Sequence, residues 1–189
     1  MNTEFGLVAR ARLFAMAAHK AVGQRRKYTG EEYFCHCQSV ANITSEVTND
    51  PEMLAAALLH DTVEDTGVTH EDILDEFGPG VAGLVEGLTD VSKPEDGNRA
   101  ARKKLDREHT AKASARAQTI KCADFTDNWD SIVLNDAKFA RTYFFEKMAL
   151  LPCLKDADPI LLGRVRARLR IYADRNGLDF DAILKKATE

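Results

Sequence analysis

Residues 58–66 read LLHDTVEDT and place one histidine among three carboxylates. His60 and Asp61 are adjacent and offer one nitrogen and one oxygen ligand, and Glu64 and Asp65 follow closely. The preceding residues are apolar, and an ionised carboxylate is costly in such surroundings unless a cation compensates it. The segment therefore indicates a divalent metal site, although a helix end followed by an exposed acidic loop has the same composition.

A second histidine, His36, lies in helical register with Val40, Ile43 and Val47. This spacing places His36 on the apolar face of a helix, where it is either a buried core residue or a nitrogen ligand. Cysteines flank His36 on both sides, but consecutive helical side chains point about 100° apart. The three residues therefore cannot converge on one ion, and a local zinc site is excluded.

A further carboxylate stands out in residues 121–128, which read KCADFTDN. Lys121, Asp124 and Asn128 are spaced by three and four residues, so they share one face of a predicted helix. An apolar stripe that begins at Cys122 lies on the neighbouring face, which places Asp124 at the edge of a core. A solvated polar face is the alternative interpretation of this spacing.

Two nitrogen and two oxygen ligands result when these candidates are combined, namely His36, His60, Asp61 and Asp124. Such a set suits Mn²⁺, Fe²⁺ or Zn²⁺ and leaves coordination positions for water or substrate. A divalent metal makes a bound water more acidic, and hence nucleophilic near neutral pH. Glu64 and Asp65 are then the candidates to orient that water or to carry its proton.

The balance of charge argues for a small anionic partner. The 26 basic and 30 acidic residues leave a net charge of −4, whereas binding to a nucleic-acid polymer usually needs a basic surplus. Two basic clusters nevertheless occur, Arg25-Arg26-Lys27 and the stretch 99–107, which contains Lys103. Both suit phosphate groups, and solvated helix faces are the alternative interpretation.

Apolar residues recur at helical spacing along almost the whole chain, and no alternating strand pattern occurs. The apolar stripe from Leu7 to Val22 predicts a first amphipathic helix, which begins near Met1 and ends at Gly23. Further helices are predicted around 36–47, from Pro51, from a capping box at 69–72 to Gly78, from Pro79, from Asn98, and at 122–133, 136–150, 159–175 and 180–187. A loop is predicted at 93–97, and the expected fold class is all-α.

The length of 189 residues fits a single domain, residues 1–189, with the motifs at about 8–150 and further helices at about 151–189. No run of 18 apolar residues occurs, and charged residues interrupt the N-terminal segment. Neither a transmembrane helix nor a signal peptide is therefore expected. Four cysteines are few for a disulfide scaffold. We expect a cytoplasmic protein without a membrane partner.

Taken together, the motifs resemble those of a known family. The matching segments are Arg26-Lys27, residues 30–36, and the strings AALLHDTVEDTGVT, EFGPGVAGLVEGLTDVSK, NRAARKKLDREH and QTIKCADFTDN. They are similar to the HD-domain hydrolases of the alarmone (p)ppGpp, which form the hydrolase half of the Rel/SpoT proteins. Within that family they look most like the small alarmone hydrolases and the metazoan Mesh-type enzymes, and the resemblance covers about residues 8–150.

The resemblance implies a fold, a reaction and a set of site residues. The implied fold is the all-helical HD-domain bundle, and the implied reaction hydrolyses the 3′-pyrophosphate of (p)ppGpp to give GDP or GTP and pyrophosphate. One Mn²⁺ is implied, bound by His36, His60, Asp61 and Asp124. The implied catalytic acidic pair is Glu64 and Asp65. Substrate-binding roles are implied for Arg26, Lys27, Asn128 and Tyr143, and the second basic cluster adds Lys103 as a candidate.

The chain departs from the family pattern at Glu32 and Cys37, where the family usually has proline. Neither departure replaces a ligand, but Glu32 lies in the loop that carries Arg26 and Lys27. The alternative substrates for the same site are (p)ppApp and the 2′-phosphate of NADPH, and outside the enzymes the alternative is a non-catalytic alarmone-binding module. No synthetase domain is expected, because the resemblance takes up most of the chain. The oligomeric state is not encoded in any pattern that we can interpret.

Overall fold

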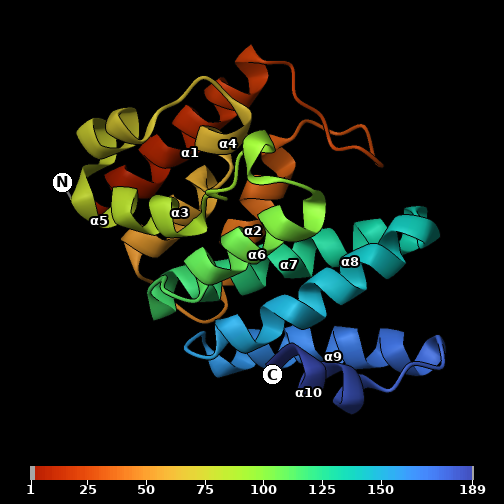
Figure 1. Ribbon diagram of the computed structural model, residues 1–189. Coiled ribbons are helices and arrows are strands. Elements are labelled where there is room, and N and C mark those ends of the chain that lie inside the picture. Colours follow the sequence, from red (N-terminus) through yellow and green to blue (C-terminus); the bar gives the residue numbers. More distant parts are fainter. Residues whose placement is uncertain (1–2, 189) are drawn as a thin grey trace. The chain divides into compact units, whose positions relative to one another are not determined.

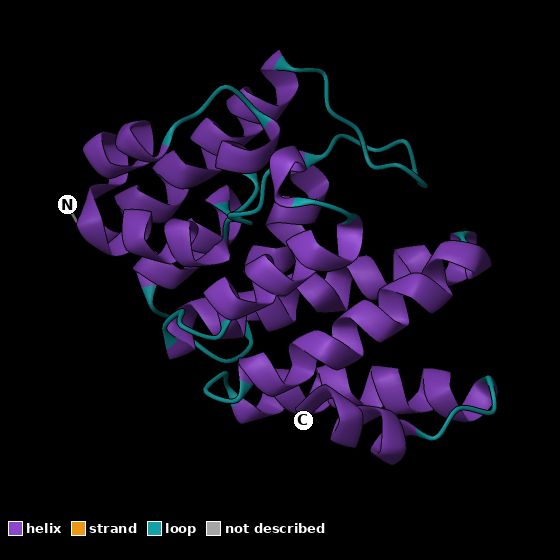
Figure 2. Ribbon diagram, viewed as in Figure 1, coloured by secondary structure: helices purple, strands orange, loops and turns teal. Residues whose placement is uncertain are grey.

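Helices dominate the computed structural model, which describes residues 3–188 of the chain (Figure 2). No β-strand occurs among these residues, although an antiparallel bridge joins Arg25 to Glu32 in the loop after the first helix. The predicted all-α class is therefore confirmed. Met1 and Asn2, with which the first helix was expected to begin, lie outside the described residues.

The chain folds as two compact units, Met1–Asp90 and Val91–Glu189. The first unit contains α1 (Thr3–Ala21), α2 (Phe34–Ser45), α3 (Pro51–Leu59), α4 (Thr62–Asp65) and α5 (His70–Leu88) (Figure 1). Helix α3 packs against α1, α2 and α5, and Leu58 and Leu59 at its C-terminal end are fully buried, as the apolar run predicts. Asp50 caps this helix by accepting from the backbone N–H of Glu52 at 3.0 Å.

Two of the predicted apolar stripes extend too far. Gly23 adopts a φ of 64° after the last turn of α1, so Val22 lies beyond the helix and is 52% exposed. Val47 likewise follows the end of α2. The buried face of α1 includes Ala15 and, one turn later, His19.

Helix α5 begins and bends where the sequence predicts. The hydroxyl of Thr69 accepts from the backbone N–H of Asp72 at 3.1 Å, and the Asp72 carboxylate accepts from the backbone N–H of Thr69 at 2.8 Å. This capping box confirms the predicted helix start. Gly78 has φ 82° and ψ 172°, which interrupts the helical conformation just before Pro79. The boundary predicted at Gly78 is therefore confirmed, as a kink at which two helical segments of α5 meet.

The second unit contains α6 (Arg99–Thr110), α7 (Ala115–Asn135), α8 (Ala137–Leu150), α9 (Pro159–Arg175), α10 (Phe180–Thr188) and the 3₁₀ turns η1 (Pro94–Asp96) and η2 (Leu151–Leu154). Helix α7 packs against α8 and α9, and Phe125 and Phe144 fill the core between them. The helices predicted for this part of the chain are confirmed, and the predicted loop at 93–97 holds η1.

Within the described residues, no helix has both the length and the apolar character that a membrane crossing requires. The chain divides into two compact units. That residues 1–189 form a single domain stays a prediction.

Candidate metal centre and active site

Two imidazole rings and one carboxylate meet in the first unit. His36 lies on the first turn of α2 and His60 directly follows α3; both are almost fully buried, with ring centroids 5.1 Å apart. Asp61 directly precedes α4, and its Oδ2 lies 3.1 Å from Nε2 of His60 and 3.5 Å from Nε2 of His36. Three of the predicted ligands are thus brought together at the ends of three helices.

The hydrogen bonding of His60 suits a metal ligand. Nδ1 of His60 lies 2.9 Å from the carbonyl oxygen of Ala57, which can only accept, so Nδ1 carries the proton. In the neutral ring Nε2 then holds a lone pair, and that atom faces the Asp61 carboxylate. Two atoms with lone pairs at this distance need a proton or a metal cation between them. Metal-bound histidines commonly have their second nitrogen fixed in this way.

Asp61 is held in its ionised form. Burial raises its pKa, but the charges and hydrogen bonds of His60 and His36 outweigh that effect and bring the pKa well below its usual value. The hydroxyl of Tyr33 also donates to Oδ2 of Asp61 at 2.6 Å, which favours the charged carboxylate. The sequence-based interpretation missed Tyr33. Its place three residues before His36, on the same side of the helix start, was the available signal.

The acidic pair lies on its own short helix. Glu64 and Asp65 belong to α4, which two residues separate from the end of α3, and both side chains are exposed. Oε1 of Glu64 accepts from the backbone N–H of Asp90 at 2.7 Å, and Oδ2 of Asp65 accepts from the side-chain amide of Gln24 at 2.8 Å. Each carboxylate is therefore anchored yet open to solvent, an arrangement that suits proton transfer.

The first basic cluster lies in the loop between α1 and α2. The loop is closed by backbone hydrogen bonds from Arg26 N to Glu31 O at 2.9 Å and from Gly30 N to Arg26 O at 3.0 Å. The exposed side chain of Lys27 places Nζ 4.7 Å from the ring centroid of Tyr28. The backbone thus shapes this loop, and phosphate binding by Arg26 and Lys27 stays a prediction.

Asp124 and Asn128 belong to the second unit, one turn apart on α7. Nδ2 of Asn128 donates to Oδ1 of Asp124 at 2.7 Å, and Asp124 is only 9% exposed. Burial, together with the charges of Asp158 and Asp124, raises the pKa of Cys122 to about 12, so this thiol stays protonated. A buried, ionised carboxylate such as that of Asp124 needs a hydrogen bond or a cation to offset the cost of its burial. Metal binding by Asp124 would supply such a cation, and this role stays a prediction.

Two other substrate-binding candidates also lie in the second unit. Tyr143 on α8 is 8% exposed and stacks on Phe125, with ring centroids 6.2 Å apart and planes 6° from parallel. Nζ of Lys103 lies 3.2 Å from the carboxylate of Asp106, which is buried. Tyr143 therefore contributes to the core of its unit and Lys103 is ion-paired, and their contacts with substrate stay predictions.

Known proteins resemble this chain over most of its length. The family described as HD domain matches residues 11–142. The guanosine-3′,5′-bis(diphosphate) 3′-pyrophosphohydrolase MESH1 of Drosophila melanogaster is 43% identical over 122 residues, which cover 63% of this chain and 66% of that protein. A protein of Aquifex aeolicus, also named guanosine-3′,5′-bis(diphosphate) 3′-pyrophosphohydrolase, is 45% identical over 86 residues, covering 46% of this chain and 12% of that protein.

A solved structure extends the likeness to the fold. It is described as a metazoan ortholog of SpoT that hydrolyzes ppGpp and plays a role in starvation responses. It has a TM-score of 0.77 and 32% identity, and the match covers 92% of this chain and 97% of that one. The chain spans just under two thirds of the length of the Drosophila relative and a small fraction of the Aquifex relative. With most of its residues matched by the family and its fold shared with this neighbour, the chain belongs to the HD-domain family.

Proposed function

We propose that this chain hydrolyses the 3′-pyrophosphate of (p)ppGpp, releasing GDP or GTP together with pyrophosphate. The observation that carries the proposal is the meeting of the Nε2 atoms of His36 and His60 at the Asp61 carboxylate, with Glu64 and Asp65 on the helix that follows. The names of the Drosophila and Aquifex relatives support this choice of substrate.

The proposed metal is one Mn²⁺, and the proposed fourth ligand is Asp124. Two imidazole nitrogens and two carboxylate oxygens suit Mn²⁺, and they also suit Fe²⁺ or Zn²⁺. When bound, such a metal polarises a phosphoryl oxygen and makes water more acidic. The Asn128 amide, which bonds Oδ1 of Asp124, holds this carboxylate in one orientation.

The remaining roles divide between proton transfer and charge compensation. Glu64 and Asp65 orient the attacking water and take up its proton, because both are anchored carboxylates exposed to solvent. Arg26 and Lys27 compensate the phosphate charge, since cationic side chains bind phosphate oxygens strongly. Lys103, Asn128 and Tyr143 are proposed to complete substrate binding.

The proposed setting is the cytoplasm, with a small nucleotide and not a nucleic-acid polymer as the partner. Among the described residues no disulfide joins the four cysteines, which suits a reducing compartment: Cys35, Cys37, Cys122 and Cys153. The net charge of −4 speaks against a polyanionic polymer.

Turnover of ppGpp, ppApp and NADPH with Mn²⁺, measured side by side, tests the proposal. Pyrophosphate release should be fastest from ppGpp, and Glu64→Ala should lower kcat at least about 100-fold. Glu71→Ala, at an exposed position on α5, is the matched control and should keep the wild-type rate. Faster release of pyrophosphate from ppApp, or of phosphate from NADPH, would show that this compound and not ppGpp is the substrate. Tight binding of ppGpp without turnover would indicate a binding module.

A further inference from the structure

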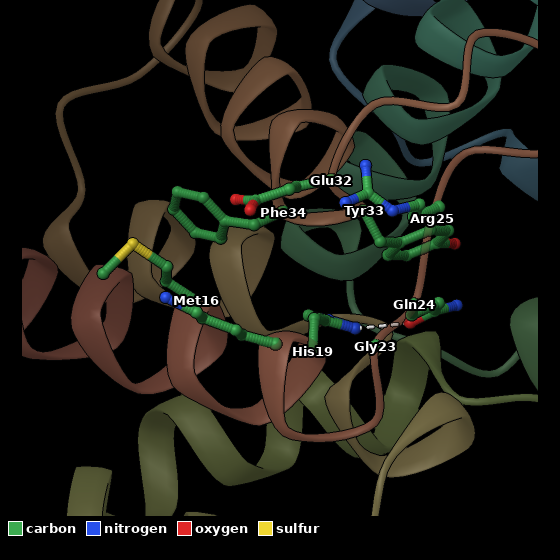
Figure 3. Close-up of a pocket in the computed structure, with 9 residues that line it drawn as sticks. Met16, His19, Gly23, Gln24, Arg25, Glu32, Tyr33 and Phe34 are labelled. Atoms are coloured by element: carbon green, nitrogen blue, oxygen red, sulfur yellow. Dashed lines mark hydrogen bonds between the residues drawn. The ribbon is translucent and has the colours of Figure 1, made fainter.

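A chain of side-chain hydrogen bonds runs from the interior of the first unit to the acidic pair. Oδ2 of Asp65 accepts from Nε2 of Gln24 at 2.8 Å, and the other end of that amide, Oε1, lies 2.6 Å from Nδ1 of His19. Figure 3 shows the His19 ring joined to Gln24 by this hydrogen bond. Both residues line a cavity of about 180 Å³, together with Tyr33. His19 belongs to α1 and Asp65 to α4, so the chain joins elements distant in sequence.

The direction of each hydrogen bond follows from the chemistry of its ends. An ionised Asp65 can only accept, so the NH₂ group of Gln24 faces it and the amide oxygen faces His19. Nδ1 of His19 must then carry the ring proton, which leaves Nε2 with a lone pair. Nε2 lies 3.5 Å from Sγ of Cys37, whose S–H is the available donor. All three bonds therefore point the same way and end on Asp65.

Burial and backbone contacts hold this chain in place. His19 is 1% exposed, and burial lowers its pKa despite the raising effect of Gln24, so the ring is neutral near pH 7. Gln24 is fixed at the backbone, where its N–H bonds the carbonyl oxygen of His19 at 3.1 Å and its own carbonyl accepts from Tyr33 N at 3.2 Å. The amide that reaches Asp65 is therefore preorganised and does not depend on a mobile surface side chain.

We propose that His19 and Gln24 are positioning residues that set the orientation of the Asp65 carboxylate for its work on the attacking water. The inference rests on the proposed function, in which Asp65 belongs to the acidic pair. The Gln24 amide occupies Oδ2, so it limits rotation of the carboxylate and leaves the other oxygen to accept a proton. The neutral His19 in turn fixes which end of the amide faces Asp65.

Kinetics of Gln24→Leu separate positioning from general damage. We expect kcat for ppGpp to fall about tenfold or more, with KM within twofold, because the lost bond is to a charged group and not to substrate. In an Asp65→Asn background the same substitution should cost less than twofold, since Gln24 acts through Asp65. Gln38→Leu, on α2, is the matched control and should leave both constants unchanged. An equal loss in both backgrounds would overturn the positioning role.

His19 is tested by replacement and by its own protonation. His19→Asn retains a donor in the region of Nδ1 and should keep kcat within about threefold, whereas His19→Phe keeps the packing volume and should match Gln24→Leu. Long-range ¹⁵N correlation spectra of the full chain should show the Nδ1–H tautomer for His19, and this signature should be lost in Gln24→Leu. An Nε2–H tautomer or a doubly protonated ring at pH 7.5 would overturn the inference. If the wild-type protein shows the expected tautomer but no turnover of ppGpp, the proposed function fails and this geometry stands.

Discussion

The Asp61 carboxylate shows how much of the site depends on single side chains. Oδ2 of Asp61 faces Nε2 atoms of two histidines and also receives the Tyr33 hydroxyl. The hydroxyl donates a hydrogen bond to the carboxylate, which orients the carboxylate and favours its ionised form. Mutation of a residue that orients a metal ligand in this way commonly lowers metal affinity about 10- to 100-fold.

Tyr33→Phe should therefore weaken Mn²⁺ binding about 10-fold while the fold is preserved, because the ring keeps its packing and only the hydroxyl is lost. Isothermal titration calorimetry with Mn²⁺ measures this affinity. Tyr172→Phe, in the second unit, is the control for removal of a hydroxyl and should bind as wild type does. Equal affinities for all three proteins would show that the Tyr33 hydroxyl does not support the ligand.

His19 makes folding stability depend on pH. Its folded pKa lies below 6.5, the ordinary value, because burial disfavours the charged ring. Below pH 6.5 the unfolded chain therefore binds more protons than the folded chain, so the His19 contribution is fully present above that pH and is lost as the pH falls.

The predicted outcome is a weaker acid dependence in His19→Asn. As the pH falls from 7.5 to 5.5, the free energy of unfolding of the metal-free wild-type protein should decrease more steeply than that of His19→Asn. The two slopes should differ by up to about 1.4 kcal/mol per pH unit. Urea unfolding at a series of pH values measures both curves. Parallel curves would mean that the pKa of His19 is the same in the folded and unfolded chains.

At the scale of elements, the break between α3 and α4 forms the site. Helix α3 ends at Leu59 and α4 begins at Thr62, so His60 and Asp61 occupy the junction. A continuous helix would point these neighbours about 100° apart. The junction instead brings Nε2 of His60 to 3.1 Å from the Asp61 carboxylate and turns the acidic pair onto a new helix.

Helix α5 offers a test of backbone conformation with an internal control. Gly78 has a φ of 82°, which side-chain-bearing residues rarely adopt, whereas Gly83 is helical, exposed and has open space around it. Gly78→Ala should lower the free energy of unfolding by about 1–2 kcal/mol. Gly83→Ala should raise it by about 0.5–1 kcal/mol. Urea unfolding compares the two variants, and a stabilising Gly78→Ala would show that the kink relaxes without cost.

At the scale of the whole molecule, binding of the proposed metal is coupled to folding. A metal that binds only the folded protein stabilises it by mass action, by about 2.7 kcal/mol at a concentration 100 times Kd. Added Mn²⁺ should therefore raise Tm, and EDTA should reverse the change. Differential scanning calorimetry measures this effect.

The same experiment tests Asp124. Asp61→Asn and Asp124→Asn should each remove most of the Mn²⁺-dependent rise in Tm, since each loses one anionic ligand. Asp130→Asn, an exposed carboxylate on α7 that pairs with Arg168, is the control and should keep the rise. An Asp124→Asn protein with the full rise would exclude Asp124 as a ligand.

The sequence alone determined the helical class, the capped starts of α3 and α5, the break at Gly78 and the candidate ligands. These features depend on spacing within one element and on short-range chemistry, so local patterns carry them. The apolar pattern placed Val22 and Val47 within helices, but both residues lie beyond the ends of α1 and α2. The pattern extends too far because apolar residues continue past the last turn of each helix.

Only the tertiary structure decided which atoms meet. Tyr33 reaches Asp61 across 28 residues, and Gln24 reaches Asp65 across 41. His19 is buried on α1 and faces Gln24. Such contacts form between separate elements once the chain has packed, and the spacing of residues within a single helix does not encode them.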